Sequence, residues 1–138
     1  MEYKKERKTL RHIISIPLIW GVLPAFIFID ICLEIYHRIC FPLYGIPYVK
    51  RSSYIVFNRH KLDYPPWYDK INCAYCEYAN WLLHYCSVIT GRTEKYWCAI
   101  KHYPKKGYVE PPYHKDFIPY GDINSYFKMT APRRGRSH

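Results

Sequence analysis

The chain has 138 residues, of which 49% are apolar or aromatic and 23% are charged. This composition fits one small domain and excludes a disordered polymer. Lys and Arg total 21 against 11 Asp and Glu, which gives a formal net charge of +10. A surface this basic favours anionic partners: lipid headgroups, an acidic substrate or nucleic acid.

A charge-free apolar stretch, IISIPLIWGVLPAFIFI, occupies residues 13–29. Because a hydrocarbon core about 30 Å thick requires about 20 helical residues, we expect the membrane helix to extend over residues 13–40. Pro17 and Pro24 predict a kink near residues 20–24. Such a helix can span the bilayer, re-enter by the same face or lie at the interface. A buried helix of a soluble core is the remaining alternative.

Basic residues flank the apolar stretch on both sides, so the positive-inside rule assigns no orientation. No small-x-small cleavage site follows the stretch, and a cleavable signal peptide is therefore not expected. The sequence predicts a basic segment (1–12), the membrane helix (13–40), a small Cys/His/Tyr-rich domain (41–130) and a disordered basic tail (131–138). We expect a membrane protein with its bulk in the cytoplasm, where its basic surface meets anionic lipid.

Asp30, Glu34 and His37 follow the stretch at helical spacing and share one face. Glu-x-x-His is the spacing with which di-iron bundle proteins place a carboxylate and an imidazole on one metal. The three residues are therefore a secondary metal-site candidate, although the second Glu-x-x-His of such sites is missing here. The alternative is an interfacial helix end whose carboxylates pair with Arg38 or a basic partner.

Two of the six cysteines, Cys32 and Cys40, lie in or beside the apolar stretch, where free thiols pack as small hydrophobes. The others form a pattern, because a Cys-x2-Cys pair is followed by a Cys-x3-His pair. Two such pairs can supply a tetrahedral thiolate-imidazole site. The sequence thus predicts a zinc or iron site with the ligands Cys73, Cys76, Cys98 and His102, and with His84 and Cys86 in reserve.

This site requires the chain to reverse direction between its two ligand pairs. Apolar residues recur at intervals of three and four over residues 66–88, which predicts a helix. Gly91 is expected to end it, and Thr93 to cap a second short helix that stops at Pro104. The predicted fold is mainly α: an N-terminal membrane-inserted helix, then a helical hairpin with irregular Tyr/Pro-rich segments. The four ligands meet only if the connection between the helices lies at residues 86–92 or if Cys73 and Cys76 lie on a loop.

Other interpretations of the cysteines remain open: a dithiol redox pair at Cys73 and Cys76, an iron-sulfur cluster, buried free thiols or a structural disulfide.

The remaining segments predict little regular structure. Residues 54–57, YIVF, are the one predicted strand. Residues 103–122 are rich in Pro and Tyr and predict an irregular wrap around the hairpin. Within them, His114 and Asp116 form a reserve metal pair.

Several runs together, RICFPLYGIP, RSSYIVFNRHKLDY, NCAYCEYAN, RTEKYWCAIKH and FIPYGD, resemble a group of small membrane-anchored bacterial proteins. The resemblance covers about residues 30–122. It implies a bacterial protein with one membrane helix, and therefore a place in the bacterial inner membrane, and it implies no activity, cofactor or fold.

These observations predict a membrane-anchored metal-binding accessory or scaffold protein that holds zinc or iron. The alternatives are an iron-sulfur or dithiol redox protein and a metal-free membrane-interaction subunit. Expected partners are anionic lipid and either a membrane protein or a second copy of the chain. Nucleic-acid binding is not expected because no nucleic-acid-binding motif occurs. No nucleophile elbow, phosphate loop or dinucleotide fingerprint supports a self-contained enzyme.

Overall fold

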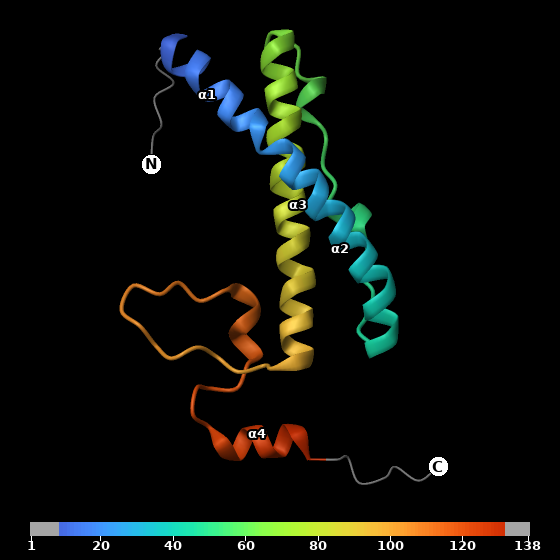
Figure 1. Cartoon of the computed structure of the whole chain (residues 1–138), viewed down its shortest axis with the longest axis vertical. Helices are drawn as coiled ribbons and strands as arrows, with labels where there is room; N and C mark the ends of the chain where they lie inside the picture. Colours follow the sequence, from blue (N-terminus) through green and yellow to red (C-terminus); the bar gives the residue numbers. More distant parts are fainter. Residues whose placement is uncertain (1–8, 132–138) are drawn as a thin grey trace. The chain divides into compact units, whose positions relative to one another are not determined.

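The computed structural model describes residues 9–131, of which 69% are helical and none form a strand. The mainly helical fold with a long apolar N-terminal helix is confirmed. Most of the predicted basic segment (1–12) and basic tail (131–138) lies outside the described residues. The helices are α1 (Thr9–Gly21), α2 (Leu23–Tyr44), α3 (Trp67–Trp97) and α4 (Ile123–Thr130), with the 3-10 helices η1 (Arg51–Ser53), η2 (Arg59–Lys61) and η3 (Pro112–Asp116) (Figure 1).

The chain packs as two compact units, the first ending at Leu83 and the second beginning at His84. This boundary falls inside α3, which is a continuous helix. The units are described separately below.

The apolar N-terminal segment contains one break, at Val22 between α1 and α2. It falls within the region where the two prolines predict a kink, and Pro24 occupies the start of α2. Backbone bonds bridge the break, since the Val22 N–H donates to the Ile19 carbonyl at 3.3 Å. Together α1 and α2 form one helical segment, Leu10–Tyr44, with a mean hydropathy of 2.2 in an 18-residue window, long and apolar enough to cross a membrane. Gly45 ends it in the left-handed conformation (φ +65°).

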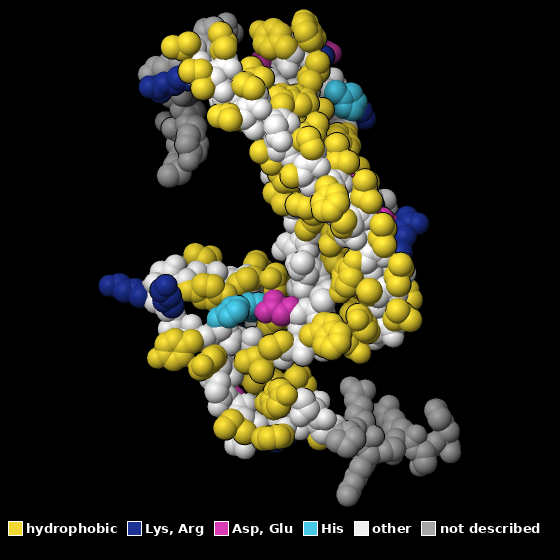
Figure 2. Space-filling view, viewed as in Figure 1, with side chains coloured by type: hydrophobic (Ala, Val, Ile, Leu, Met, Phe, Trp, Pro, Cys, Tyr) yellow, Lys and Arg dark blue, Asp and Glu magenta, His cyan; other side chains and the backbone are white. Residues whose placement is uncertain are grey.

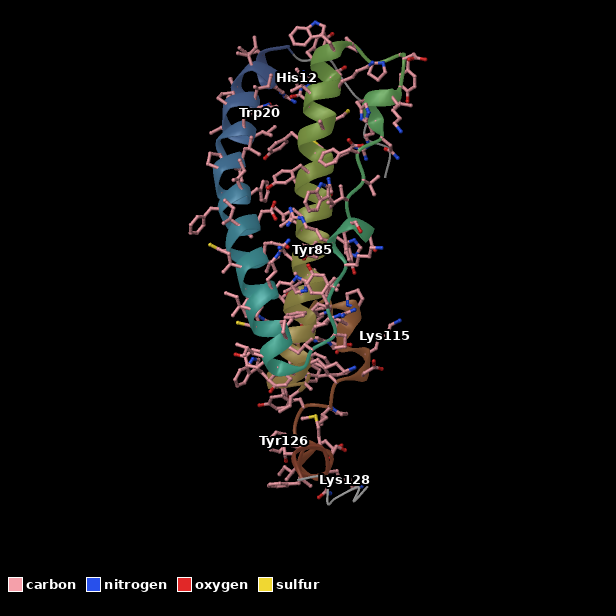
Figure 3. All side chains as sticks on the ribbon, turned by 90° about the vertical axis from the view of Figure 1, so that its right-hand side faces the viewer. His12, Trp20, Tyr85, Lys115, Tyr126 and Lys128 are labelled. Carbon is pink, nitrogen blue, oxygen red and sulfur yellow. The ribbon has the colours of Figure 1, made fainter. Side chains whose placement is uncertain are left out.

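In the first unit, this segment and the first half of α3 run in the same direction (Figures 1 and 3). The Trp20 indole N–H donates to the Asn72 side-chain oxygen at 3.3 Å, and the Tyr78 hydroxyl donates to Asp30 at 3.0 Å. Because both helices advance between these two contacts, the pair is parallel. A non-helical connection must therefore return along their length.

The return segment, residues 45–66, lies against α3 in the opposite direction (green in Figure 1). The backbone N–H groups of Asn58 and Arg59 both donate to the Glu77 carboxylate, at 3.2 and 3.0 Å. Phe57 meets Trp81 edge to face, with ring centroids 6.3 Å apart. The predicted strand at residues 54–57 is wrong: this apolar run packs against a helix and has no neighbouring strand to pair with.

The predicted helical hairpin does not form, because α3 continues through Gly91 to Trp97. Gly91 admits the Tyr113 ring of η3, which lies where a β-carbon would be. The Thr93 hydroxyl donates to the Ile89 carbonyl at 2.9 Å, so it bonds back along the helix and caps no new one. A tertiary contact thus overrides the local tendency of glycine to end a helix, which is worth about 1 kcal/mol.

Gly91→Ala is expected to destabilise the second unit by about 1–2 kcal/mol. The new β-carbon would lie 2.8 Å from Cγ of Tyr113, which is the fixed end of a rigid ring. The overlap outweighs the gain in helix propensity. Urea unfolding followed by circular dichroism measures the change. Gly21→Ala is the matched control, since its β-carbon meets no atom within 4 Å. Equal stability of Gly91→Ala and wild type would contradict the close contact.

The second unit closes around the end of α3. Ala99 adopts a positive φ of 48° and turns the chain out of the helix. A bridge between Ile100 and Ile118 then ties the outgoing chain to the returning chain. Asp122 caps α4 by accepting the Ser125 N–H at 3.1 Å, and its hydrogen bonds to Ser125 lower the pKa of its carboxyl group.

Candidate metal centre

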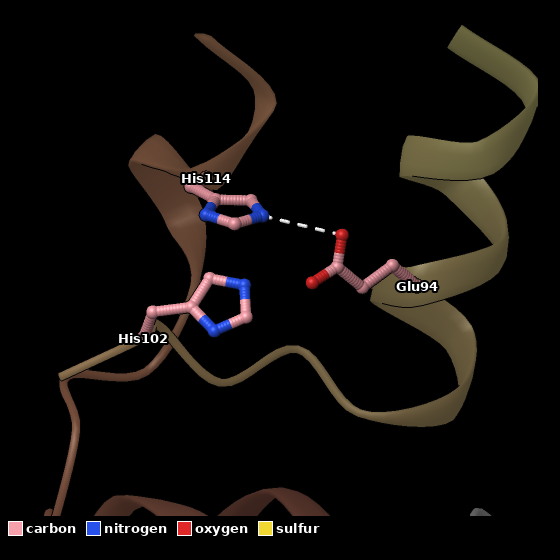
Figure 4. Close-up of side chains that lie close together, drawn as sticks. All are labelled: Glu94, His102 and His114. Atoms are coloured by element: carbon pink, nitrogen blue, oxygen red, sulfur yellow. Dashed lines mark hydrogen bonds and ion pairs between the residues drawn. The ribbon is translucent and has the colours of Figure 1, made fainter. Parts of the chain in front are cut away.

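Three side chains of the second unit converge beside the end of α3: Glu94, His102 and His114 (Figure 4). One potential ligand atom from each lies within 4.8 Å of the other two. Glu94 belongs to the last turn of α3, His102 follows the helix, and His114 belongs to η3. The cluster therefore joins three segments of the unit.

The backbone at the end of α3 creates this convergence. The N–H groups of Cys98 and Ala99 both donate to the Glu94 carbonyl, at 2.8 and 3.0 Å. Beyond Ala99, the Lys101 N–H donates to the Ile118 carbonyl at 2.8 Å. The chain thus leaves the helix, is fixed beside residue 118 and brings His102 and η3 against Glu94.

His114 is the buried member, with a residue exposure of 1%. Its ring stacks on Phe117, with centroids 4.6 Å apart, and lies 5.7 Å from the ring of His102. Nε2 of His114 is 3.2 Å from a carboxylate oxygen of Glu94. Nδ1 is buried and has no hydrogen-bond partner among the described residues. Without metal, the proton of a neutral ring is best placed on Nε2, where Glu94 accepts it.

Tyr113 adds a phenol to the surroundings of Glu94. Burial raises the pKa of Tyr113, and the nearby Glu94 carboxylate raises it further. The phenol is therefore neutral at physiological pH, and the carboxylate carries the negative charge of the cluster.

The donor set suits a divalent transition metal. Two ligands bound tetrahedrally at about 2.1 Å from one zinc ion lie about 3.4 Å apart. The 3.2 Å separation of His114 and Glu94 fits this value. His102 is exposed, so its ring has room to move the remaining distance toward them. Two imidazoles and one carboxylate bind zinc or iron(II) and leave a coordination position open.

The four ligands predicted from the Cys/His spacing are divided between the two units. Cys73 and Cys76 lie in the part of α3 that belongs to the first unit, and Cys98 directly follows the end of α3 in the second. The hairpin that was expected to join the two pairs is absent, because α3 continues through Gly91. Of the four, His102 alone belongs to the cluster.

The dithiol pair of the redox alternative, Cys73 and Cys76, lies inside α3. A reactive Cys-x2-Cys pair benefits from the electrostatic field of a helix N-terminus, which acts within the first turn. Cys73 lies in the second turn of α3. All six cysteines are free thiols in the structure.

The secondary candidate, Asp30, Glu34 and His37, also has other partners. Arg51 bonds to both carboxylates, to Asp30 at 2.9 Å and to Glu34 at 3.2 Å. His37 is buried, and its Nε2 accepts the N–H of Val49 at 3.1 Å. The reserve residues His84 and Cys86 lie within α3, outside the cluster.

The sequence patterns missed Glu94 and identified His114 only in the reserve pair with Asp116. Asp116 in fact pairs with Lys95, at 3.6 Å. The ligands sit eight and twelve residues apart along the chain, which is no recognised metal-binding spacing. Only the turn at Ala99 and the packing of η3 on Gly91 bring them together. Comparison of the chain with protein-family models, curated proteins and solved structures gives no match.

Proposed function

We propose that this chain is a membrane-associated accessory protein that binds one divalent zinc or iron ion through Glu94, His102 and His114. The observation that carries the proposal is the convergence of three ligand atoms from three segments. The buried His114 and the carboxylate already lie at the spacing that one ion requires. The cysteines play no part in this site.

A metal here would have a structural effect. It would link α3, the chain after α3 and η3, which are also joined by the bridge between Ile100 and Ile118, the contact of Tyr113 with Gly91 and the ring contact between His102 and His114. Binding free energy at such a site adds directly to folding free energy. Binding also requires the proton between His114 and Glu94 to leave, so affinity is expected to fall as the pH decreases.

Membrane association is the second part of the proposal. It is supported by the segment Leu10–Tyr44, which is long and apolar enough to cross a membrane. The basic composition favours a membrane with anionic lipid.

The test is metal titration of the full chain in mild detergent, prepared without a metal-affinity column. Zinc and anaerobic iron(II) are each titrated calorimetrically, and bound metal is measured by elemental analysis. We expect one equivalent per chain. His102→Ala should abolish stoichiometric binding, and His84→Ala, another exposed histidine, is the matched control. The double variant Cys73→Ser/Cys76→Ser should bind like wild type.

Two results would overturn the proposed site. One is the absence of stoichiometric binding by the folded wild-type chain. The other is loss of metal binding in the double cysteine variant together with normal binding by His102→Ala, which would show that the cysteine thiols are the ligands.

A further inference from the structure

The outward face of the Leu10–Tyr44 segment is a continuous apolar surface (Figure 2). Large hydrophobic side chains recur along it at helical spacing, each more than half exposed: Leu10, Ile13, Ile14, Leu18, Phe28, Ile31, Ile35, Ile39 and Leu43. Soluble proteins rarely leave an apolar face of this length in water. It must be covered.

The opposite face of the same segment carries both of its acidic side chains and is already occupied. Both of its acids, Asp30 and Glu34, point to that side and bond to Arg51 of the return segment. Tyr78 of α3 donates to Asp30 from the same side. Charge and apolar surface are thus separated onto two faces of one helical segment.

The length of the segment does not match a perpendicular crossing. Its 35 residues extend about 52 Å, whereas the hydrocarbon core is about 30 Å thick. A crossing centred on the segment would also place the Asp30–Arg51 pair close to the bilayer centre, where charges are costly.

The return segment gives the strongest argument. Residues 45–66 are mostly non-helical and run beside α3 along the depth that a crossing would occupy. They expose the basic side chains Lys50, Arg59, His60 and Lys61. Irregular backbone exposed to lipid does not occur inside the hydrocarbon layer. The first unit as folded therefore cannot surround a bilayer-spanning helix.

We infer that the first unit is seated in one leaflet, with α1 and α2 lying along the membrane plane. The outward apolar face enters the acyl chains, and the face toward α3 and the return segment remains at the headgroups and water. The occupant of the apolar face is thus a lipid leaflet. Anionic headgroups fit the exposed Arg11 and Arg38 at its margins, since a long basic stem can reach from apolar surface to headgroup. This inference rests on the membrane association proposed above and replaces a crossing by in-plane insertion.

The test measures the depth of four outward positions in vesicles. Single cysteines replace Leu18, Phe28, Ile35 or Leu43 in a full-length background whose native cysteines are changed to serine, and circular dichroism verifies each fold. Spin labels at these positions are examined in phosphatidylcholine vesicles with 30% phosphatidylglycerol. In-plane insertion predicts the same shallow depth, about 5–10 Å below the headgroups, at all four.

The other outcomes identify what fails. A depth that rises to a maximum and falls again along the segment shows a crossing and overturns the inference alone. Labels that are shielded from both oxygen and aqueous nickel show a protein partner or a second copy on this face, which also overturns it. Labels freely accessible to aqueous nickel show no insertion, and the proposed membrane association then fails too.

A substitution pair gives an independent measurement. Ile35→Ser removes an apolar side chain from the outward face, and Leu83→Ser removes one of similar exposure from α3. We expect Ile35→Ser to lower the vesicle partition coefficient about tenfold and Leu83→Ser to leave it unchanged. Equal effects of the two substitutions would overturn the assignment of the lipid-facing side.

Discussion

Glu94→Gln is expected to weaken zinc or iron(II) binding by at least about 100-fold. Glu94 supplies the one anionic ligand of the cluster, and an amide oxygen is a much poorer ligand for a divalent ion. Loss of even an outer partner of a metal ligand costs 10- to 100-fold in affinity, so loss of a direct ligand is expected to reach the upper end or exceed it. Competition titration with a chromophoric chelator measures the affinity.

The substitution is chosen because it preserves the shape of the site. The glutamine side-chain oxygen can still accept the His114 proton that Glu94 accepts at 3.2 Å, so the metal-free fold should remain intact. Glu110→Gln makes the same chemical change in the same unit, where Glu110 pairs with Lys101 at 3.2 Å. It should bind metal like wild type. If both variants lose affinity equally, the effect is one of net charge, and Glu94 is not a ligand.

The helical character of the chain was predictable because its signals are local. The apolar run at residues 13–29 and the periodicity over residues 66–88 both specify helices in the structure. The end of the second helix was not predictable. Gly91 is a usual signal of a helix end and Thr93 of a helix cap. In the structure Gly91 instead contacts Tyr113, which is distant in sequence, the Thr93 hydroxyl bonds to the Ile89 carbonyl, and the helix continues through both residues.

The candidate site was predicted only in part, through His102 and through His114 as a reserve ligand, for a related reason. Its geometry depends on a left-handed turn at Ala99, a conformation that sequence patterns assign to glycine or asparagine. An alanine at this position does not predict such a turn. The regular Cys-x2-Cys spacing was a stronger pattern, but its use as half of a metal site depended on a helical hairpin, and α3 continues without one.

Arg51→Met is expected to destabilise the first unit by about 3 kcal/mol. The guanidinium group bonds to Asp30 through both terminal nitrogens and to Glu34 through one, and it lies 4.9 Å above the Trp81 ring. The side chain of Arg51 is 27% exposed, and those of Asp30 and Glu34 are 14% and 19% exposed. Asp30 keeps the Tyr78 hydroxyl and Glu34 keeps the exposed Arg38. Removing Arg51 nevertheless takes away the cation that bridges two partly buried carboxylates one helical turn apart, which increases their repulsion and leaves part of their desolvation uncompensated.

Urea unfolding in detergent, followed by tryptophan fluorescence, measures this loss. The midpoint should fall, and the slope should stay constant if the compactness of both states is unchanged. Lys95→Met is the control for removal of a basic side chain from an exposed pair. Lys95 and Asp116 are 3.6 Å apart and largely exposed. Loss of this ion pair should change the free energy of unfolding by no more than about 0.5 kcal/mol.

The combined variant Asp30→Asn/Glu34→Gln/Arg51→Met separates the two sources of the loss. If uncompensated charge is the cause, neutralising both acids should recover most of the 3 kcal/mol. If the variant remains as unstable as Arg51→Met, the lost contribution is the packing of the arginine stem on Trp81. The charge network would then have no net stabilising role, and its position on the inner face would serve to keep charge away from the apolar surface.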